Sequence, residues 1–530
     1  MYPRFPTLYS FYKDYEMPLQ RAFYEIEKRG ILTDPLRLLL LHKHILKEKQ
    51  VTLDEIKRLT STTVISKNET KGKPDLSVIN LSSPKQLILW LNSIGIKLPK
   101  NRDTGNETTN QEALEKIYAE TGNPVLRHIL RNRELNKIDG TYIRAWLNRD
   151  ILYSSYFATG TVGGRRSSRK NFLGLGTNHQ NLPKHSFLGR AFRSCLIARQ
   201  GRIFVSADLK GAEDWIVHGI IADQGGSLQG INELKAGINR HKKTASLLFG
   251  LPIEQLSKDD IEYYLAKRSR HGFNYGMMGD KQSRILAAEG IGLEGLYLVL
   301  QDGRKMTLPK EYLLYAQMDF AQRSRAYRNN HTPIAFAGFC SYLNAKLDSL
   351  EPDIRRVYQK YIIGAMSNNG QLITPIGRIR DFMSLRPGDD NGSVFRDGFS
   401  YIPQSTVGDI TGLAILYLET HYPGLVISDG HDAVVTESLD SFDSVRNCIH
   451  HISNAYKQII EFPNGTKITI PIEFEIGYDL GGMLPWDESL GEAGLKNILS
   501  TLSQLQKRRV PTTGGQQPHL SEPVLSETFG

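Results

Sequence analysis

The strand-like segments of this chain fall into two groups, with a long and mainly helical stretch between them. Strand patterns occur in ILYSSYFATG (151–160) and GRIFVSADLKG (201–211), and again in QLITPIGRIRDF (371–382), LVISDGHDAVV (425–435) and KITIPIEFEIGYDL (467–480). Short apolar or alternating runs of this kind are typical of strands, whereas the spacing from about 230 to 360 is helical. We therefore predict an α+β fold in which a helical insertion interrupts a sheet subdomain.

Helical patterns also dominate the first part of the chain, for example in YEMPLQRAFYEIEKRG (15–30). The polar segment SKNETKGKPD (66–75) is predicted to be an exposed connection, and the residues from about Gln506 are rich in Pro, Thr, Gly and Gln, which favours disorder. A chain of 530 residues is too long for one core, so several subdomains are expected. The predicted parts are an N-terminal helical region (1–150), a first sheet part (151–235), a helical part (236–360), a second sheet part (361–490) and a largely disordered C-terminal segment (491–530).

The charge distribution favours a polyanionic partner. The formal net charge is +10, from 66 Lys and Arg against 56 Asp and Glu. Basic residues cluster in GGRRSSRK (163–170), AKRSRHG (266–272) and QRSRAYR (322–328), although any single cluster taken alone is better explained as a solvated surface.

The sequence contains no apolar run near the ~20 residues that span a bilayer and no signal pattern at its start. Its three cysteines, Cys195, Cys340 and Cys448, lie far apart and match no metal-ligand spacing, so they are interpreted as reduced packing residues. A cytoplasmic protein without a membrane segment is expected.

Two aspartates are candidates for a metal site. Asp432 lies at a Gly-marked bend between two short apolar runs, where local grounds alone favour an ordinary turn residue. Asp208 follows the apolar run from Ile203 to Val205 and precedes a helical pattern, so the alternative is a helix N-cap. Two carboxylates at separate strand ends, in a chain with basic clusters, suit a two-metal phosphoryl-transfer site. Glu213, five residues after Asp208, is placed to line the same cleft.

A second candidate is the predicted helix in IEYYLAKRSRHGFNYGMMG (261–279). Tyr263, Lys267, His271 and Tyr275 recur at steps of four, so they share one helix face. Lys267 could hold a triphosphate while His271 and Tyr275 stack on a base or sugar. The alternative is an amphipathic helix whose aromatic rings pack inward.

From about Tyr15 to Trp486 the chain resembles the family A, DNA polymerase I-like, DNA polymerases. The resemblance depends on the order of its motifs: TVGGRRSS (161–168), TNHQNLP (177–183), DLKGAE (208–213), RHKKTA (240–245), AKRSRHGFNYGM (266–277), LITPIGRIR (372–380), PQSTVGD (403–409) and His431-Asp432-Ala433. In the first part, LSSPKQL (81–87) and RNRELNKIDGTY (131–142) resemble segments of the family's thumb.

The resemblance implies a right-hand fold with a helical thumb (within 1–150), an antiparallel-sheet palm and mainly helical fingers. It also implies template-directed addition of dNTPs to a primer 3′ end with two Mg²⁺ ions, for which Mn²⁺ can substitute. Asp208 and Asp432 would be catalytic and would bind the metals together with Leu209. By the same resemblance, the nucleotide-binding residues are Glu213, His241, Lys267, His271 and Tyr275, and the residues binding primer-template DNA are Arg165, Gln180, Asn181, Arg396, Gln404 and His431.

The chain departs from the family pattern at four positions. Tyr263 replaces an Arg, so that Arg268 or Arg270 would have to reach the triphosphate, while Ala433 replaces a Glu, Leu209 a Tyr and Ser400 an Asn. Neither metal-binding Asp is lost, so an active but divergent enzyme is expected.

We expect a monomeric phage or mobile-element enzyme that lacks its own 3′–5′ exonuclease. It would act in the host cytoplasm and leave an exonuclease or processivity factor to a separate partner protein. Two other functions fit the same residues: a single-subunit RNA polymerase, and a catalytically weakened primer-template binding protein.

Overall fold

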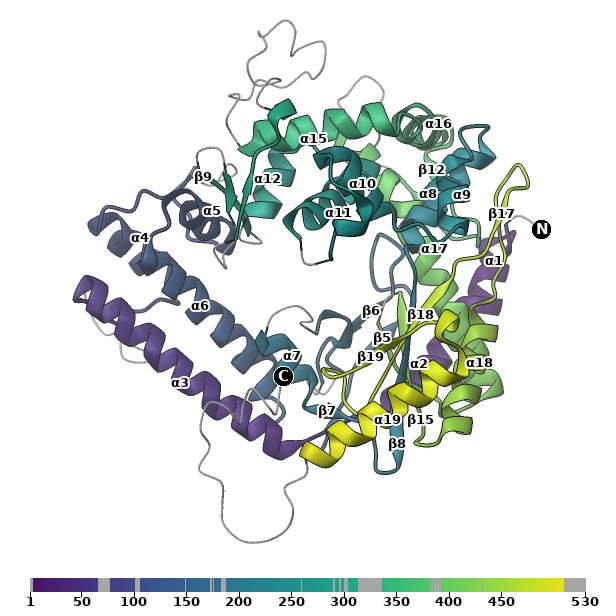
Figure 1. The fold of residues 1–530 in the computed structure, drawn as a ribbon, viewed down its shortest axis with the longest axis horizontal. Helices are drawn as coiled ribbons and strands as arrows, with labels where there is room; N and C mark the ends of the chain where they lie inside the picture. The colour runs from purple at the N-terminus through teal and green to yellow at the C-terminus, as the bar shows by residue number, and fades with distance from the viewer. Residues whose placement is uncertain are drawn as a thin grey trace, which may run out of the picture. The chain divides into compact units, whose positions relative to one another are not determined.

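The computed structural model describes residues 3–64, 77–100, 105–147, 149–171, 174, 176–182, 187–258, 260–288, 291–294, 297–299, 304–312, 336–382, 385, 392–430 and 432–509 (Figure 1). The chain forms two compact units. The first, called the sheet unit, comprises Met1–His42, Ile138–Asn232 and Val357–Gly530, and the second, called the helical unit, comprises Lys43–Lys137 and Glu233–Arg356. The predicted segment 66–75 and the basic cluster 322–328 lie outside the described residues.

A five-stranded antiparallel sheet forms the centre of the sheet unit. Its strand order is β14 (Val426–Asp429), β15 (Ala433–Leu439), β8 (Arg202–Leu209), β18 (Ile472–Gly477) and β19 (Leu484–Trp486). The central strand β8 is therefore paired with two strands that lie more than 220 residues later in the chain. Together with the surrounding helices, this sheet confirms the predicted α+β class.

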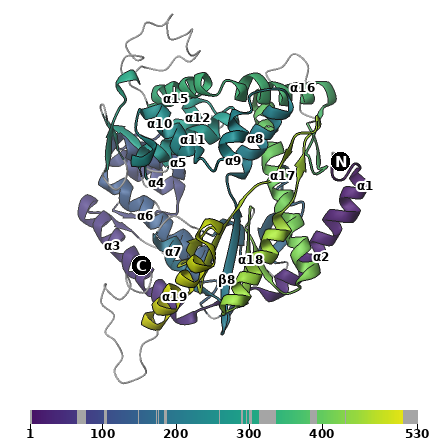
Figure 2. The ribbon, with the colours of Figure 1, turned by 45° about the vertical axis from the view of Figure 1, so that its right-hand side comes forward.

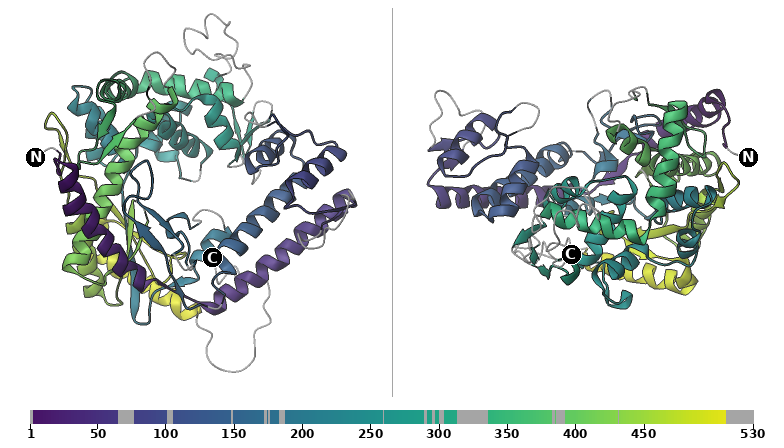
Figure 3. Two further views of the ribbon diagram at one scale, coloured as in Figure 1. Left: turned by 180° about the vertical axis from the view of Figure 1, so that it is seen from behind. Right: turned by 90° about the horizontal axis from the view of Figure 1, so that it is seen from above.

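Helices cover the sheet because its strands are apolar on both faces. In β8, Ile203, Phe204 and Val205 are successive residues and all are fully buried. Helix α18 (Phe442–Tyr456) packs against β8, β15 and β18 (Figure 2). Helix α17 (Gly392–His421), buried along much of its length, packs against α8 (Ala212–Asp223) and lies alongside α2 (Met17–Arg29) (Figure 3).

Shorter elements complete the sheet unit. Its small antiparallel pairings join β1 (Ile31–Thr33) with β4 (Ile151–Leu152) and β7 (Leu196–Ile197), β5 (Ser155–Phe157) with β6 (Ser167–Arg169), β12 (Gln371–Ile373) with β13 (Ile379–Asp381), and β16 (Ile460–Glu461) with β17 (Lys467–Ile468). Its other helices and helical turns are α1 (Leu8–Phe11), η1 (Tyr12–Glu16), η2 (Asp139–Ile143), η3 (His179–Asn181), α7 (Phe187–Arg193), α16 (Lys360–Asn369), η6 (Glu488–Leu490) and α19 (Gly491–Arg509).

The C-terminal segment differs from the prediction. Residues 491–509 form the helix α19, whereas a largely disordered segment was expected from 491 onward. The helix has an apolar face, on which Leu495 and Leu502 are buried, and this packing stabilises it. Residues 510–530 lie outside the described part of the chain.

The helical unit contains two groups of helices. The elements of its first segment are most of α3 (Pro35–Thr60), β2 (Thr63–Val64), β3 (Val78–Ile79), α4 (Pro84–Ser93), α5 (Gln111–Thr121) and α6 (Pro124–Ile138). The helices and helical turns of its second segment are part of α9 (Gln229–Lys235), α10 (Arg240–Phe249), η4 (Ile253–Gln255), α11 (Ile261–Asn274), α12 (Gly279–Ala288), α15 (Phe336–Leu350) and part of η5 (Ile354–Gln359). This segment also contains a small antiparallel sheet of β9 (Gly292–Glu294), β10 (Tyr297–Val299) and β11 (Lys305–Thr307). The sequence did not predict this sheet.

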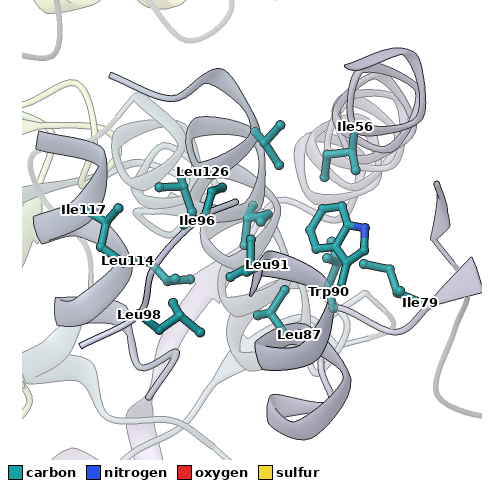
Figure 4. Close-up of a cluster of buried hydrophobic side chains, with 13 residues drawn as sticks. Ile56, Ile79, Leu87, Trp90, Leu91, Ile96, Leu98, Leu114, Ile117 and Leu126 are labelled. Atoms are coloured by element: carbon teal, nitrogen blue, oxygen red, sulfur yellow. The ribbon is translucent and has the colours of Figure 1, made fainter. Parts of the chain in front are cut away.

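An apolar cluster around Trp90 holds the first segment together (Figure 4). Leu87, Leu91 and Leu114 are fully buried in this cluster. The indole N–H of Trp90 donates to Thr62 Oγ1 at 3.0 Å, so its one polar atom is satisfied inside the cluster.

The three cysteines are buried free thiols, as predicted. Burial raises the pKa of each thiol, that of Cys448 to about 11, so they are unreactive packing residues. Among the described helices, none combines the length and the apolar character needed to cross a membrane.

Candidate active site

The pairing of β8 with β15 brings the two candidate metal-binding aspartates together. Asp208, near the end of β8, is the direct partner of Ala433 at the start of β15. The backbone N–H of Leu209 donates to the carbonyl oxygen of Asp432 at 3.3 Å. Asp432 comes one residue before Ala433, so Asp208 and Asp432 lie at the same end of the β8–β15 pair. Both side chains are exposed.

Local conformation explains how each aspartate is presented. Gly430 donates its backbone N–H to the Ala433 carbonyl at 2.8 Å, which closes the bend that carries Asp432. The bend lies between two buried strands, so Asp432 is both a turn residue and an accessible carboxylate. Asp208 is not an N-cap, because α8 is capped by Gly211 with a left-handed φ of 62°. Asp208 itself still belongs to β8.

The donor set fits an open magnesium site. Within the described residues, no group of three or more His, Cys, Asp or Glu side chains is close enough to hold a metal ion. Mg²⁺ commonly binds to one or two protein carboxylates and completes its shell with water and substrate phosphates. Asp208 and Asp432 supply such a pair, and Leu209 could add only its main-chain carbonyl because its side chain has no donor atom.

A third carboxylate, Glu473, lies next to Asp208 and was not found from the sequence. Glu473 on β18 is the direct partner of Asp208 on the side of β8 away from β15. Its carboxylate pairs with Lys210 Nζ at 3.2 Å, and both side chains are about half exposed. The strand pattern in 467–480 predicts β18, but it contains no signal for the strand beside which β18 lies.

Arg165 and Glu213 form an ion pair. Arg165 Nη2 lies 3.0 Å from Glu213 Oε1, in the first turn of α8. The preceding Gly164 has a φ of +71°, and a Cβ atom there would lie 2.5 Å from Ser405 Oγ and 2.6 Å from Arg378 Cδ. Only glycine fits this close approach without displacing its neighbours, so Gly164 determines the path of the loop that carries Arg165.

Gln180 and Asn181 lie together on the 3₁₀ turn η3. Asn178 caps this turn by accepting the N–H of Asn181 at 3.1 Å, and Ser168 Oγ donates to the same Asn178 oxygen at 2.7 Å. The Asn181 side chain is exposed, whereas Gln180 Nε2 donates to Asp429 Oδ2 at 3.0 Å. Asn181 is therefore accessible to a ligand, and Gln180 is linked to the strand that precedes Asp432.

The remaining predicted DNA-binding residues lie on α17, except one. The Arg396 side chain is exposed near the start of this helix, and Gln404 is half-buried beside Pro403. The next residue, Ser405, donates its hydroxyl to the Gly163 carbonyl at 2.5 Å, which joins α17 to the loop of Arg165. His431 lies outside the described residues.

The predicted nucleotide-binding residues of the helical unit lie on α10 and α11. Lys267 and His271 are exposed on α11, and the His271 ring packs edge-on against Tyr275 with centroids 5.0 Å apart. Tyr263 is buried and meets the His241 ring edge-on at 6.1 Å. The inward-packing alternative therefore holds for Tyr263, while the Lys267–His271 part of the face is accessible.

One of the two arginines expected to replace the missing family Arg cannot do so in this conformation. Arg270 is buried, and its guanidinium is bound to both carboxylate oxygens of Glu351, one of them through Nη2 at 2.9 Å. Arg240 binds the same carboxylate at 2.8 Å, so Arg270 belongs to a structural ion-pair cluster. Arg268 is exposed and packs over the Tyr264 ring, and it remains the candidate for triphosphate contact.

Comparisons with known proteins agree with the motifs. Residues 50–290 match the model of DNA polymerase family A. The chain is 28% identical over 284 residues to the thermostable DNA polymerase I of Thermus caldophilus, covering 52% of this chain and 30% of that protein. It is 27% identical over 295 residues to DNA polymerase I of Pseudomonas aeruginosa, covering 54% of this chain and 29% of that protein. The aligned region thus spans about a third of the length of these relatives.

The fold is similar to that of a solved polymerase domain. The POL domain of Pol1 from M. smegmatis, in complex with DNA primer-template and dNTP, superposes with a TM-score of 0.66 at 19% identity, covering 89% of this chain and 71% of that one. The sequence motifs and the family model over residues 50–290 are therefore both similar to family A of the DNA polymerases, and the fold is similar to that of a solved polymerase domain.

Proposed function

We propose that this chain is a DNA-directed DNA polymerase that extends a primer by two-metal phosphoryl transfer. The observation that carries the proposal is the placement of Asp208 and Asp432, two exposed carboxylates from distant parts of the chain, at the same end of the β8–β15 strand pair. Neither helix capping nor turn formation requires a second exposed carboxylate on the paired strand.

In the proposed reaction the primer 3′ oxygen bonds to the α-phosphorus of a dNTP while the bond to the β-phosphate breaks, releasing pyrophosphate. Divalent ions bound by Asp208, Asp432 and the Leu209 carbonyl would supply charge neutralisation at the phosphates. The protein contributes mainly position, because phosphoryl transfer requires alignment of the attacking oxygen and stabilisation of charge more than covalent chemistry.

The other predicted residues have roles that suit their placement. The exposed Arg396 and Asn181 side chains, together with Arg165, Gln180, Gln404 and His431, would hold primer-template DNA, and the net charge of +10 favours this polyanion. Lys267 and His241 would hold the triphosphate, while His271 and Tyr275 would contact the base or sugar. Glu213 would occupy the place from which the family excludes a ribose 2′-hydroxyl, and the Arg165 ion pair would keep its carboxylate in position.

A primer-extension assay with a labelled primer on a defined template tests this proposal. Reactions contain Mg²⁺ and either dNTPs or NTPs, with EDTA and Mn²⁺ reactions in parallel. Extension with dNTPs that EDTA abolishes is the expected result. Extension with NTPs alone would favour the RNA polymerase alternative, and tight primer-template binding without any product would favour the non-catalytic binding protein.

The lack of a 3′–5′ exonuclease, the phage or mobile-element origin, the monomeric state and the cytoplasmic location stay predictions. The first is checked by incubating a labelled single-stranded DNA with the protein and Mg²⁺ without nucleotides. The expected result is an intact 3′ end. Light scattering of the purified chain checks the monomeric state.

A further inference from the structure

A buried ion pair links the hairpin of the catalytic aspartate to the segment that carries three predicted DNA-binding residues. Asp429, the last residue of β14, lies three residues before Asp432 and is fully buried. Arg166 Nε lies 2.8 Å from one Asp429 carboxylate oxygen and Nη2 lies 2.7 Å from the other. The Arg166 side chain is itself only 1% exposed. Paired contacts of this kind fix the relative orientation of the two groups as well as their distance.

The same carboxylate has a third partner from the predicted DNA-binding surface. Gln180 Nε2 donates to Asp429 Oδ2 at 3.0 Å. Arg166 also donates to the carbonyl oxygen of Gly408, so its guanidinium is held by α17 as well. Arg165 and Asn181, both predicted to bind DNA, are the immediate neighbours of Arg166 and Gln180 in the chain.

A second link runs parallel to the first, one residue earlier on β14. The hydroxyl of Ser428 lies 3.0 Å from the Tyr156 hydroxyl, which lies 2.8 Å from His179 Nδ1. Successive residues of β14, Ser428 and Asp429, are therefore connected to successive residues of η3, His179 and Gln180. All four polar groups belong to the sheet unit, and this arrangement joins β14 to η3 over two adjacent positions.

Stability alone is a poor explanation for such a pair. Two buried charges lose their hydration, and an apolar pair of similar volume often stabilises a protein as well or better. The Arg166–Asp429 pair instead fixes the position of β14 relative to the segment that carries Arg166.

We propose that Asp429 and Arg166 are positioning residues, which set the place of the Asp432 bend relative to the 161–182 segment. The inference rests on the proposed function for its catalytic consequence. DNA bound by Arg165, Gln180 and Asn181 is thereby held in register with Asp432, because a single buried carboxylate connects the two.

The test compares Asp429→Asn and Arg166→Met with a matched control on the same hairpin, Glu437→Gln. Glu437 lies on β15, is 3% exposed and pairs with Arg199 at 2.9 Å, but it is five residues beyond Asp432 and contacts no predicted DNA-binding residue in the described structure. All three substitutions remove one charge of a pair that contains a buried carboxylate, so a merely structural role predicts similar effects for all three.

The first readout is amide hydrogen exchange in the protein without DNA. Exchange at the Gly430 and Leu209 N–H groups, which bond to Ala433 and Asp432, is expected to accelerate by about tenfold or more in Asp429→Asn and Arg166→Met. Glu437→Gln should leave these two amides unchanged. Equal exchange at these amides in Asp429→Asn and Glu437→Gln would overturn the proposal.

The second readout is single-nucleotide primer extension at a temperature at which all variants are folded. The maximal rate is expected to fall by about tenfold or more in Asp429→Asn, with a smaller change in the KM for dNTP, since a misplaced carboxylate affects the reacting geometry. The Arg166→Met/Asp429→Asn double variant should be no slower than the slower single variant, because both act through one link. Additive losses in the double variant would contradict a shared link. If the unsubstituted chain does not extend a primer, the proposed function fails, while the exchange experiment still decides whether the link exists.

Discussion

Asp208 lies directly opposite Ala433 in the pairing of β8 with β15. Ala433 is the residue at which the resemblance to family A leads us to expect a Glu. Ala433 is 6% exposed, so the residue directly opposite Asp208 on β15 carries no carboxylate. On the other side of β8, Glu473 of β18 is paired with Asp208. The candidate active site thus has a further acid next to Asp208, which comes from a different strand and is paired with Lys210.

We predict that Asp432→Ala abolishes primer extension and leaves primer-template affinity largely intact. The carboxylate is needed for charge neutralisation, whereas phosphate contacts by basic residues supply most of the affinity for DNA. Extension assays and fluorescence anisotropy with labelled primer-template check the two quantities separately. Asp443→Ala is the matched control, because this side chain is 77% exposed on α18 and should affect neither. Extension at the unsubstituted rate by Asp432→Ala would refute the assignment of Asp432.

We predict that Gly164→Ala is more destabilising than Gly201→Ala. Both glycines have a φ of +71°, so each alanine costs about 1–2 kcal/mol of conformational strain. A Cβ atom at Gly201 would meet nothing within 4 Å, whereas at Gly164 it would displace Ser405 and Arg378. Urea unfolding should show a lower midpoint for Gly164→Ala, and its primer-template affinity should fall because Arg165 moves. Equal midpoints would mean that the loop adapts at no cost.

His179 makes the stability of the protein depend on pH. Burial lowers the pKa of its imidazole from 6.5 to about 3, so the folded chain keeps it neutral while the unfolded chain binds a proton. Its contribution to stability is therefore complete above about pH 6.5, and it is lost by up to about 1.4 kcal/mol per pH unit as the pH falls from there toward 3.

The variant His179→Asn isolates this effect, since Asn retains an acceptor for the Tyr156 hydroxyl but does not titrate. We expect the unsubstituted protein to lose its stability advantage over the variant as the pH is lowered from about 7 to about 4.5. Denaturant unfolding at several pH values measures the difference in free energy. A difference that stays constant over this range would contradict the prediction.

In the helical unit, we predict that Leu91→Ala destabilises by about 2–5 kcal/mol, since it removes buried methyl groups and leaves a cavity beside Trp90. The same substitution at Leu89, two residues away on α4 and 51% exposed, should change the free energy of unfolding by no more than about 0.5 kcal/mol. Chemical unfolding of the two variants, monitored by circular dichroism, gives both values. Similar losses for both would show that the cluster in Figure 4 does not govern the stability of this segment.

Local sequence patterns predicted the strands β8, β14, β15 and β18 and the bend at Asp432, because strand periodicity and turn chemistry depend on neighbouring residues. The pattern of 491–509 also contained a signal for α19, since Leu495, Ile498, Leu502 and Leu505 recur at helical spacing. The prediction of disorder over 491–509 is wrong, because this apolar spacing favours a helix and the Pro- and Gly-rich composition begins only after it.

Only the tertiary structure decided which distant residues meet. The register of β8 placed Asp208 beside Ala433 and Glu473, and the docking of β14 on η3 placed Asp429 against Arg166 and Gln180. Burial likewise removed Arg270 from the set of accessible arginines. Strand pairing and burial are set by packing across the whole chain. A local pattern can therefore identify a candidate carboxylate or guanidinium, but the residue that pairs with this group belongs to a segment hundreds of residues away.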